Sequence, residues 1–222
     1  MPVFLCWVVL MIGIAFSYGD VQAVFEGDPA AKNIFEVLTY PGVYAISMHR
    51  VNHLIYRLGV PFLPRLLSQV MRFLTFIEIH PGAQIGKAFF IDHGDGVVIG
   101  ETAVVGDHVI LYHQVTLGGT GKQKGKRHPT IGSHVIIGAG SKILGNLKVG
   151  EYCKIGAGTI VIHDVPEHST VVGNPARVVS GQKGDPFLNL GDVPDPIQEN
   201  FIRLEKEISE LKREIARDRR DK

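Results

Sequence analysis

Aliphatic residues recur at every sixth position over most of the stretch from Ile79 to Arg177. Neither the helical period of about 3.6 residues nor the alternation of an ordinary β-strand produces this spacing. Glycine often follows the aliphatic residue directly, and a small or β-branched residue stands four places after it. The aliphatic positions are Ile79, Ile85, Ile91, Ile99, Val105, Leu111, Leu117, Ile131, Ile137, Ile143, Val149, Ile155 and Val161.

Each hexapeptide of this kind supplies one short extended segment and one turn. Three units close a triangular coil of about eighteen residues, and coils stack at the interstrand spacing of roughly 4.8 Å. A set of amphipathic helices is the alternative, but every glycine inside a helix would cost about 1 kcal/mol. The period therefore predicts a parallel β-helix in which several coils share one aliphatic core.

Two interruptions break the period. The step from Ile91 to Ile99 is eight residues, and the step from Leu117 to Ile131 is fourteen. Extra residues in a rigid repeat must loop outward, and outward loops are where binding and catalytic residues concentrate. The first interruption holds the run Asp92-His93-Gly94-Asp95-Gly96, and the second is glycine-rich and basic. We expect function at these two places.

Residues 1–25 form an apolar N-terminal extension whose first sixteen residues carry no charge. A membrane helix needs roughly twenty apolar residues, and a secretory signal would begin with basic ones. Three interpretations stay open: a marginal membrane anchor, a helix packed on the next domain, or translated sequence upstream of the natural start. The last two are favoured.

Residues 26–78 predict a helical domain. Asp28 before Pro29 is typical of a helix N-cap, and apolar spacing predicts further helices over 43–58 and 64–76. His49 and His53 stand four residues apart, a spacing that could bind a metal. Because the glutamate of the usual zinc-binding helix is absent, ordinary helix packing is the favoured interpretation.

The β-helix spans residues 79–180, and the rest of the chain divides in two. Residues 181–200 are rich in Gly, Asp and Pro and predict a linker. Residues 201–222 predict an amphipathic helix whose apolar residues follow a heptad pattern flanked by Glu and Lys. Two heptads are marginal alone, so this helix either joins the tails of a symmetric trimer or lies on its own domain. The fold class is α+β: helical domain, β-helix and short C-terminal helix.

Composition narrows the partners. The 222-residue chain has a formal net charge of +1 and no basic stripe with interleaved aromatic residues, so nucleic acid is not expected to bind. Its two cysteines, Cys6 and Cys153, lie far apart and indicate neither a disulfide framework nor a cysteine metal site. This fits the reducing cytoplasm.

His93 is the strongest candidate for chemistry, because an imidazole can accept a proton near neutral pH. Such a base needs an acid that fixes its tautomer. Glu78 lies fifteen residues earlier, roughly one coil, so stacking would bring the two together. Arg127 is suited to holding a carboxylate, and His128 follows it. A loop histidine bonded to its neighbours and a solvated basic loop are the alternatives.

A zinc site between copies is another hypothesis, since a catalytic zinc usually takes three protein ligands. The histidines available for a carbonic-anhydrase-like centre are His80, His93, His108 and His113. His108 falls at a turn position, and the basic loop would then have no role. No metal is therefore expected.

Several short motifs together resemble the serine O-acetyltransferase family. They are Asp28-Pro29, His49-Arg50, Ile79-His80-Pro81-Gly82-Ala83, Ile91-Asp92-His93-Gly94, Val98-Ile99-Gly100-Glu101-Thr102, Val115-Thr116-Leu117-Gly118-Gly119-Thr120-Gly121, Arg127-His128-Pro129 and Ile143-Leu144-Gly145-Asn146. The resemblance covers about residues 28–179. It implies a left-handed β-helix that transfers acetyl from acetyl-CoA to the L-serine hydroxyl, the first committed step to cysteine.

The resemblance also implies residue roles. His93 would be the general base, oriented by Glu78 where the family often has aspartate. The residues implied to bind serine are Asp28 and Asp92, at its ammonium group, and Arg127 and His128, at its carboxylate. Those implied to line the acetyl-CoA site between neighbouring subunits are Gly119, Thr120, Ala139 and Ala157.

Partners follow from the same resemblance. Cysteine would inhibit at the serine site, and the assembly would be a homotrimer or a dimer of trimers. The ending Arg-Arg-Asp-Lys argues against a complex with O-acetylserine sulfhydrylase, since some members end in an isoleucine that inserts into that enzyme. Acetyl transfer to another hydroxyl, such as a sugar, is the alternative activity. A non-enzymatic β-helical scaffold is the third hypothesis.

Overall fold

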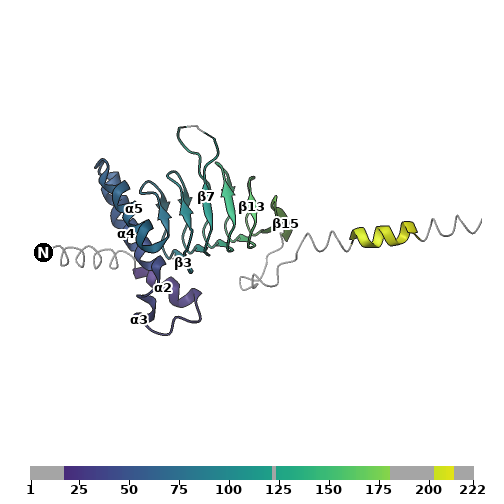
Figure 1. Ribbon diagram of the computed structural model, residues 1–222, viewed down its shortest axis with the longest axis horizontal. Coiled ribbons are helices and arrows are strands. Elements are labelled where there is room, and N and C mark those ends of the chain that lie inside the picture. The colour runs from purple at the N-terminus through teal and green to yellow at the C-terminus, as the bar shows by residue number, and fades with distance from the viewer. Residues whose placement is uncertain (1–17, 122–123, 181–202, 213–222) are drawn as a thin grey trace, which may run out of the picture.

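The computed structural model describes residues 18–121, 124–180 and 203–212. Helices come first, a three-sided stack of short strands follows, and a separate helix spans 203–212 (Figure 1). The N-terminal helices are α2 (Tyr18–Gly27), α3 (Ile34–Val37), α4 (Pro41–Arg57) and α5 (Leu63–Thr75). The stretch 1–16 and the linker lie outside the described residues. No helix in the described ranges is long and apolar enough to cross a membrane.

Fifteen short strands build the stack in the part of the chain that the structure describes. They are β1 (Glu78–Ile79), β2 (Gln84–Ile85), β3 (Phe90–Ile91), β4 (Val98–Ile99), β5 (Val104–Val105), β6 (Ile110–Leu111), β7 (Thr116–Gly118), β8 (Thr130–Ile131), β9 (Ile136–Ile137), β10 (Lys142–Leu144), β11 (Lys148–Val149), β12 (Lys154–Ile155), β13 (Ile160–Val161), β14 (Thr170–Val172) and β15 (Arg177–Ser180). Up to β13, every third strand joins the same sheet, and β14 and β15 then extend the sheet of β12; the result is a five-stranded, a four-stranded and a six-stranded face. All pairs are parallel except β14 with β15. The predicted parallel β-helix is confirmed.

The strands keep one register while the coils differ in length. Ile79 pairs with Ile99, twenty residues on, and Ile99 pairs with Leu117, eighteen residues on. Leu117 in turn pairs with Ile143, twenty-six residues on. The two interruptions therefore lengthen single coils at their turns and leave the strands aligned, as expected for loops that point outward.

The core is the predicted aliphatic column. Inward residues such as Leu111, Leu117, Ile137 and Ile143 have no exposed surface, and the small residues four places on are buried as well. Cys153 is one of these small core residues, and burial raises the pKa of its thiol. The repeat thus forms one continuous hydrophobic cluster along the stack.

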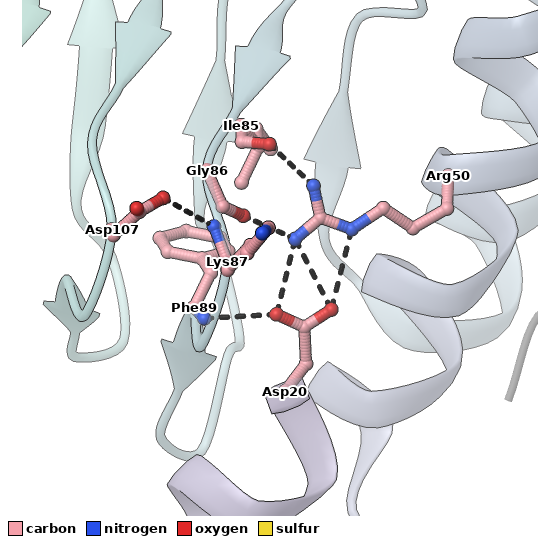
Figure 2. A network of polar contacts seen from close by, with 7 residues as sticks. All are labelled: Asp20, Arg50, Ile85, Gly86, Lys87, Phe89 and Asp107. Carbon is pink, nitrogen blue, oxygen red and sulfur yellow. Dashed lines mark hydrogen bonds and ion pairs between the residues drawn. The ribbon is translucent and has the colours of Figure 1, made fainter. Parts of the chain in front are cut away.

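Side chains of the helices close the open end of the first coil, where no preceding coil can pair with the backbone. Arg50 of α4 donates to the carbonyl groups of Ile85 and Gly86 and forms an ion pair with Asp20 of α2 (Figure 2). Asp20 in turn accepts the backbone N–H of Phe89 at 2.9 Å. These contacts fix the helical domain on the β-helix.

Two helices match the sequence prediction within a few residues, and one prediction is wrong. Asp28 is not an N-cap: the helix after it, α3, starts at Ile34 and is capped by Asn33, whose side chain accepts the N–H of Glu36 at 3.0 Å. Asp28 instead accepts the N–H of Ala30 in a turn after α2. Its carboxylate is left available at the surface of the domain.

Candidate active site

Each sheet of the stack meets its neighbours at an edge made of turns. We call the turns between the six-stranded and five-stranded sheets, at 92–97, 112–115, 138–141 and 156–159, the His93 edge. The turns between the five-stranded and four-stranded sheets, at 80–83, 100–103, 119–129 and 145–147, are the Arg127 edge. The two interruptions thus fall on opposite edges of the five-stranded sheet.

His93 projects from the first of these edges. Its backbone has a positive φ of 61°, and its side chain is 75 % exposed. The His93 Nε2 atom lies 3.9 Å from Asp92 Oδ1, and the ring of His113 from the next coil stands edge-on at 6.0 Å. The turn therefore presents an accessible imidazole beside a carboxylate.

Asp28 joins this cluster from the helical domain. Its two oxygens are held separately, one by Ala30 N–H at 2.8 Å and the other by the Tyr40 hydroxyl. The Tyr40 hydrogen bond, then the Ala30 one, lowers the pKa of Asp28, and the nearby His93 adds to this effect. The same bond raises the pKa of Tyr40 to about 12. Asp28 is thus a fixed, ionised carboxylate near His93.

Asp92 has the opposite tendency. Burial raises the pKa of its carboxyl group, the Asp28 carboxylate adds to the rise, and His93 opposes it. Burial likewise raises the pKa of Tyr112, with contributions from both carboxylates. Two carboxylates close enough to repel create a site that attracts a cation.

Glu78 has other partners within this chain. Its carboxylate accepts from Arg65 at 3.0 Å and lies 3.3 Å from Arg72, both on α5. Glu78 also pairs in register with Val98, because the first coil has twenty residues. The first coil is therefore longer than the fifteen residues that separate Glu78 from His93, and the orienting role of Glu78 stays a prediction.

Arg127 and His128 lie at the far edge of the same sheet. Arg127 is paired with Glu101 at 2.5 Å, and this ion pair lowers the pKa of Glu101. The His128 Nδ1 atom lies 2.9 Å from the Thr102 hydroxyl, which also accepts the backbone N–H groups of both Arg127 and His128. Thr102 therefore holds the end of the long loop in place.

His128 is largely buried, and burial followed by the Arg127 charge lowers its pKa. Its ring occupies the space beside Gly100, where a Cβ atom would come within 2.0 Å of the imidazole. Lys126 of the basic loop donates to the carbonyl groups of Thr102 and Pro129. The end of the loop thus packs as a unit in which burial disfavours the charged form of His128.

The residues expected to bind acetyl-CoA are also divided between the edges. Ala139 and Ala157 lie in successive turns of the His93 edge, where Gly158 N–H donates to the Ala139 carbonyl at 2.8 Å. Gly119 adjoins His128, and Thr120 adjoins Gly145, both on the Arg127 edge. No hydrogen bond or ion pair of the described residues joins the two edges.

The histidines of the zinc hypothesis do not converge within one chain. His108 stacks on His134 at the third edge, whereas His113 stands beside His93. His80 accepts the Gly82 N–H, and His53 donates to the Pro81 carbonyl at 2.8 Å. Among the residues described, no group of three or more potential ligands could hold a metal ion.

Sequence reasoning missed Glu101, Thr102 and Tyr40 as parts of the site. The length of the coil could have indicated the first two. Arg127 contacts Glu101 and His128 contacts Thr102, and both pairs are twenty-six residues apart, which is the length of that coil. Tyr40 has no such indicator, since its contact with Asp28 depends on how a turn folds in the helical domain.

Known proteins match both the repeat and the whole chain. Residues 128–163 match the family model described as bacterial transferase hexapeptide (six repeats). A serine acetyltransferase from Bacillus subtilis is 56 % identical over 206 residues, covering 91 % of this chain and 94 % of the relative. A soybean serine acetyltransferase complexed with serine superposes with a TM-score of 0.72 at 47 % identity, over 76 % of this chain and 70 % of that one.

A serine acetyltransferase in complex with cysteine superposes equally well, with a TM-score of 0.72 at 41 % identity over 76 % of this chain and 70 % of that one. Together with the stacked coils, these matches define an acyltransferase built on a left-handed β-helix of hexapeptide repeats. More narrowly, this chain belongs to the serine acetyltransferase family. The resemblance noted in the sequence is thereby confirmed.

Proposed function

We propose that this protein transfers the acetyl group of acetyl-CoA to the hydroxyl of L-serine, giving O-acetyl-L-serine and CoA. The observation that carries the proposal is the pair of edges just described. One edge offers two carboxylates beside an accessible imidazole, and the other offers an arginine beside a buried histidine. An α-amino acid with a side-chain hydroxyl has a group for each of these.

In the proposed reaction, His93 removes the proton from the serine hydroxyl as its oxygen attacks the thioester carbonyl carbon. The tetrahedral intermediate then collapses, the carbon–sulfur bond breaks, and the imidazolium returns its proton to the CoA thiolate. Attack is direct, with no acyl-enzyme, and a backbone N–H stabilises the oxyanion. Glu78 is proposed to orient the imidazole, which requires it to exchange part of its pairing with Arg65 and Arg72.

Serine would be held by its two charged groups. Asp28 and Asp92 face the ammonium group, while Arg127 and His128 face the carboxylate. Since these residues lie on opposite edges of one sheet, the complete site needs the His93 edge of one copy and the Arg127 edge of its neighbour. A homotrimer, alone or as a dimer of trimers, supplies this arrangement.

The residues expected to bind acetyl-CoA also lie on both edges, which supports the same assembly. Ala139 and Ala157 would contact acetyl-CoA from one copy, and Gly119 and Thr120 from the next. Cysteine carries the same ammonium and carboxylate groups as serine, so we propose feedback inhibition at the serine site. The reaction needs no metal, and the cytoplasm is its proposed location. Neither nucleic acid nor the sulfhydrylase is proposed as a partner.

Release of the CoA thiol from acetyl-CoA tests the proposal. We expect release that depends on L-serine, produces O-acetyl-L-serine and falls when cysteine is added. Thiol release that depends on a sugar instead of L-serine would favour the alternative acceptor. No thiol release with any hydroxyl acceptor would favour the scaffold hypothesis.

A further inference from the structure

The helix at 203–212 carries an apolar stripe that has no role in the proposed reaction. Leu204, Ile208 and Leu211 are 47 %, 50 % and 57 % exposed, although all three are large aliphatic residues. Their spacing of four and then three residues places them on one face of the helix. Such a stripe on a charged helix is typical of a surface that another helix covers.

We propose that the 203–212 helices of neighbouring copies pair in parallel as a short coiled coil. The occupant of the stripe is thus a second copy of this chain, and the proposal rests on the assembly of copies proposed above. In heptad terms, Ile208 takes the a position and Leu204 and Leu211 take d positions. Phe201 and Ile215, which belong to the heptad pattern of the sequence, lie outside the described residues.

The charges beside the stripe select the parallel direction. Glu207 stands at a g position and Lys212 at the following e position, the two places that face each other between parallel helices in register. Each therefore meets the opposite charge on the neighbour. In an antiparallel pair, g positions face g positions and e positions face e positions, so Glu207 would not meet Lys212 across the contact. Within one helix, Glu207 is bonded only loosely, to Arg203 at 3.9 Å.

Parallel pairing also agrees with cyclic symmetry, because rotation about one axis points every tail in the same direction. A coil of about two heptads is too short to form at ordinary protein concentrations. Tethering to assembled β-helices raises the local concentration of tails to the millimolar range, which offsets this weakness. The number of helices in the coiled coil would then equal the number of β-helices that assemble around one axis.

Cysteine cross-linking tests the contact in the full-length protein. We expect Leu204→Cys to form disulfides between copies about tenfold faster than Ser209→Cys, because tethered d positions meet directly and the b position points away. The unsubstituted chain, which contains Cys6 and Cys153, supplies the background rate. Equal rates for the two variants would overturn the proposal.

A charge swap tests the direction. In the Leu204→Cys protein, Lys212→Glu should slow cross-linking, and adding Glu207→Lys should restore it. Failure of the double substitution to restore the rate would overturn the parallel arrangement. Serine-dependent thiol release, assayed on the same proteins, should stay unchanged. A protein that cross-links as expected but never acetylates serine would refute the proposed function and leave the tail contact standing.

Discussion

Arg50 reaches from α4 to Asp20 on α2, 3.0 Å away, and together they satisfy backbone groups at the open end of the first coil (Figure 2). Asp20 is only 5 % exposed, so its carboxylate is removed from water and is compensated by Arg50 and the Phe89 N–H. The pair joins two helices and the β-helix at one point. It therefore determines how the helical domain sits on the stack and, with it, where Asp28 lies.

Removing one member of this pair should destabilise the protein strongly. We expect Arg50→Gln to lower the free energy of unfolding by about 3 kcal/mol, because it leaves the Asp20 charge buried and unpaired. Chemical denaturation followed by circular dichroism measures this value. Glu26→Gln, on the exposed face of α2, is the control. A loss below about 1 kcal/mol, the range of surface pairs, would contradict this account of the pair.

Loss of the His93 imidazole should abolish most of the activity. We expect His93→Ala to lower kcat by about 100-fold or more, because general-base catalysis contributes at least that much. Binding of acetyl-CoA, followed by calorimetry, should persist. His108→Ala is a matched control, since His108 also has a positive φ, 55°, in an equivalent exposed turn. A variant of His93 that keeps its turnover would refute the proposed base.

Tyr40 should position Asp28 without touching the reacting atoms. We expect Tyr40→Phe to raise the KM for serine about tenfold with little change in kcat, as a hydrogen bond to a charged group is lost. The pKa of Asp28 should rise toward its usual value, which moves the acid limit of serine binding to higher pH. Steady-state kinetics across pH measures both effects. Tyr44→Phe, which loses only a bond to the Leu38 carbonyl, should leave the KM unchanged.

Glu78 can be tested against its two visible partners. If it orients His93 during catalysis, Glu78→Gln should lower kcat about tenfold or more while the protein stays folded. Arg72→Gln removes one ion pair on the α5 side and leaves the carboxylate in place, so its kcat should match that of the unsubstituted protein. Equal kcat values for the two variants would show that Glu78 only holds α5 in place and does not orient His93.

Burial of His49 should make stability depend on pH. Its pKa is lowered from 6.5 to about 3, chiefly by burial, so the folded protein keeps this ring neutral while the unfolded chain protonates it. The contribution of this site to the free energy of unfolding is fully present above pH 6.5. It falls by about 1.4 kcal/mol for each pH unit as pH drops toward 3.

His49→Gln should flatten this part of the curve of unfolding free energy against pH. His163→Gln, at an exposed position, is the control and should keep the original slope. The same slope in the His49 variant would show that other groups govern the acid transition.

The β-helix could be predicted in detail because its period is a local property. Within each uninterrupted run between Ile79 and Val161, the inward positions follow from counting six residues along the chain. The outward loops could be located by the same count. Their internal contacts need the coil length as well, since a coil of twenty-six residues is what brings Thr102 beside His128.

The helical domain was harder to predict, since its contacts join segments without a common period. Asp28 before Pro29 looks like an N-cap, yet tertiary contacts hold it in a turn against Tyr40. Glu78 illustrates a second difficulty. The separation of fifteen residues from His93 was counted as roughly one coil, whereas the register pairs Glu78 with Val98 and makes the first coil twenty residues long.

The unequal coils have an evolutionary consequence. Coils of eighteen, twenty and twenty-six residues present strands in the same register, so a turn can gain or lose residues without disturbing the core. Folding stability and substrate chemistry are thus encoded in separate parts of the repeat. A lineage can exchange one turn for another and acquire a new acceptor while inheriting an unchanged scaffold.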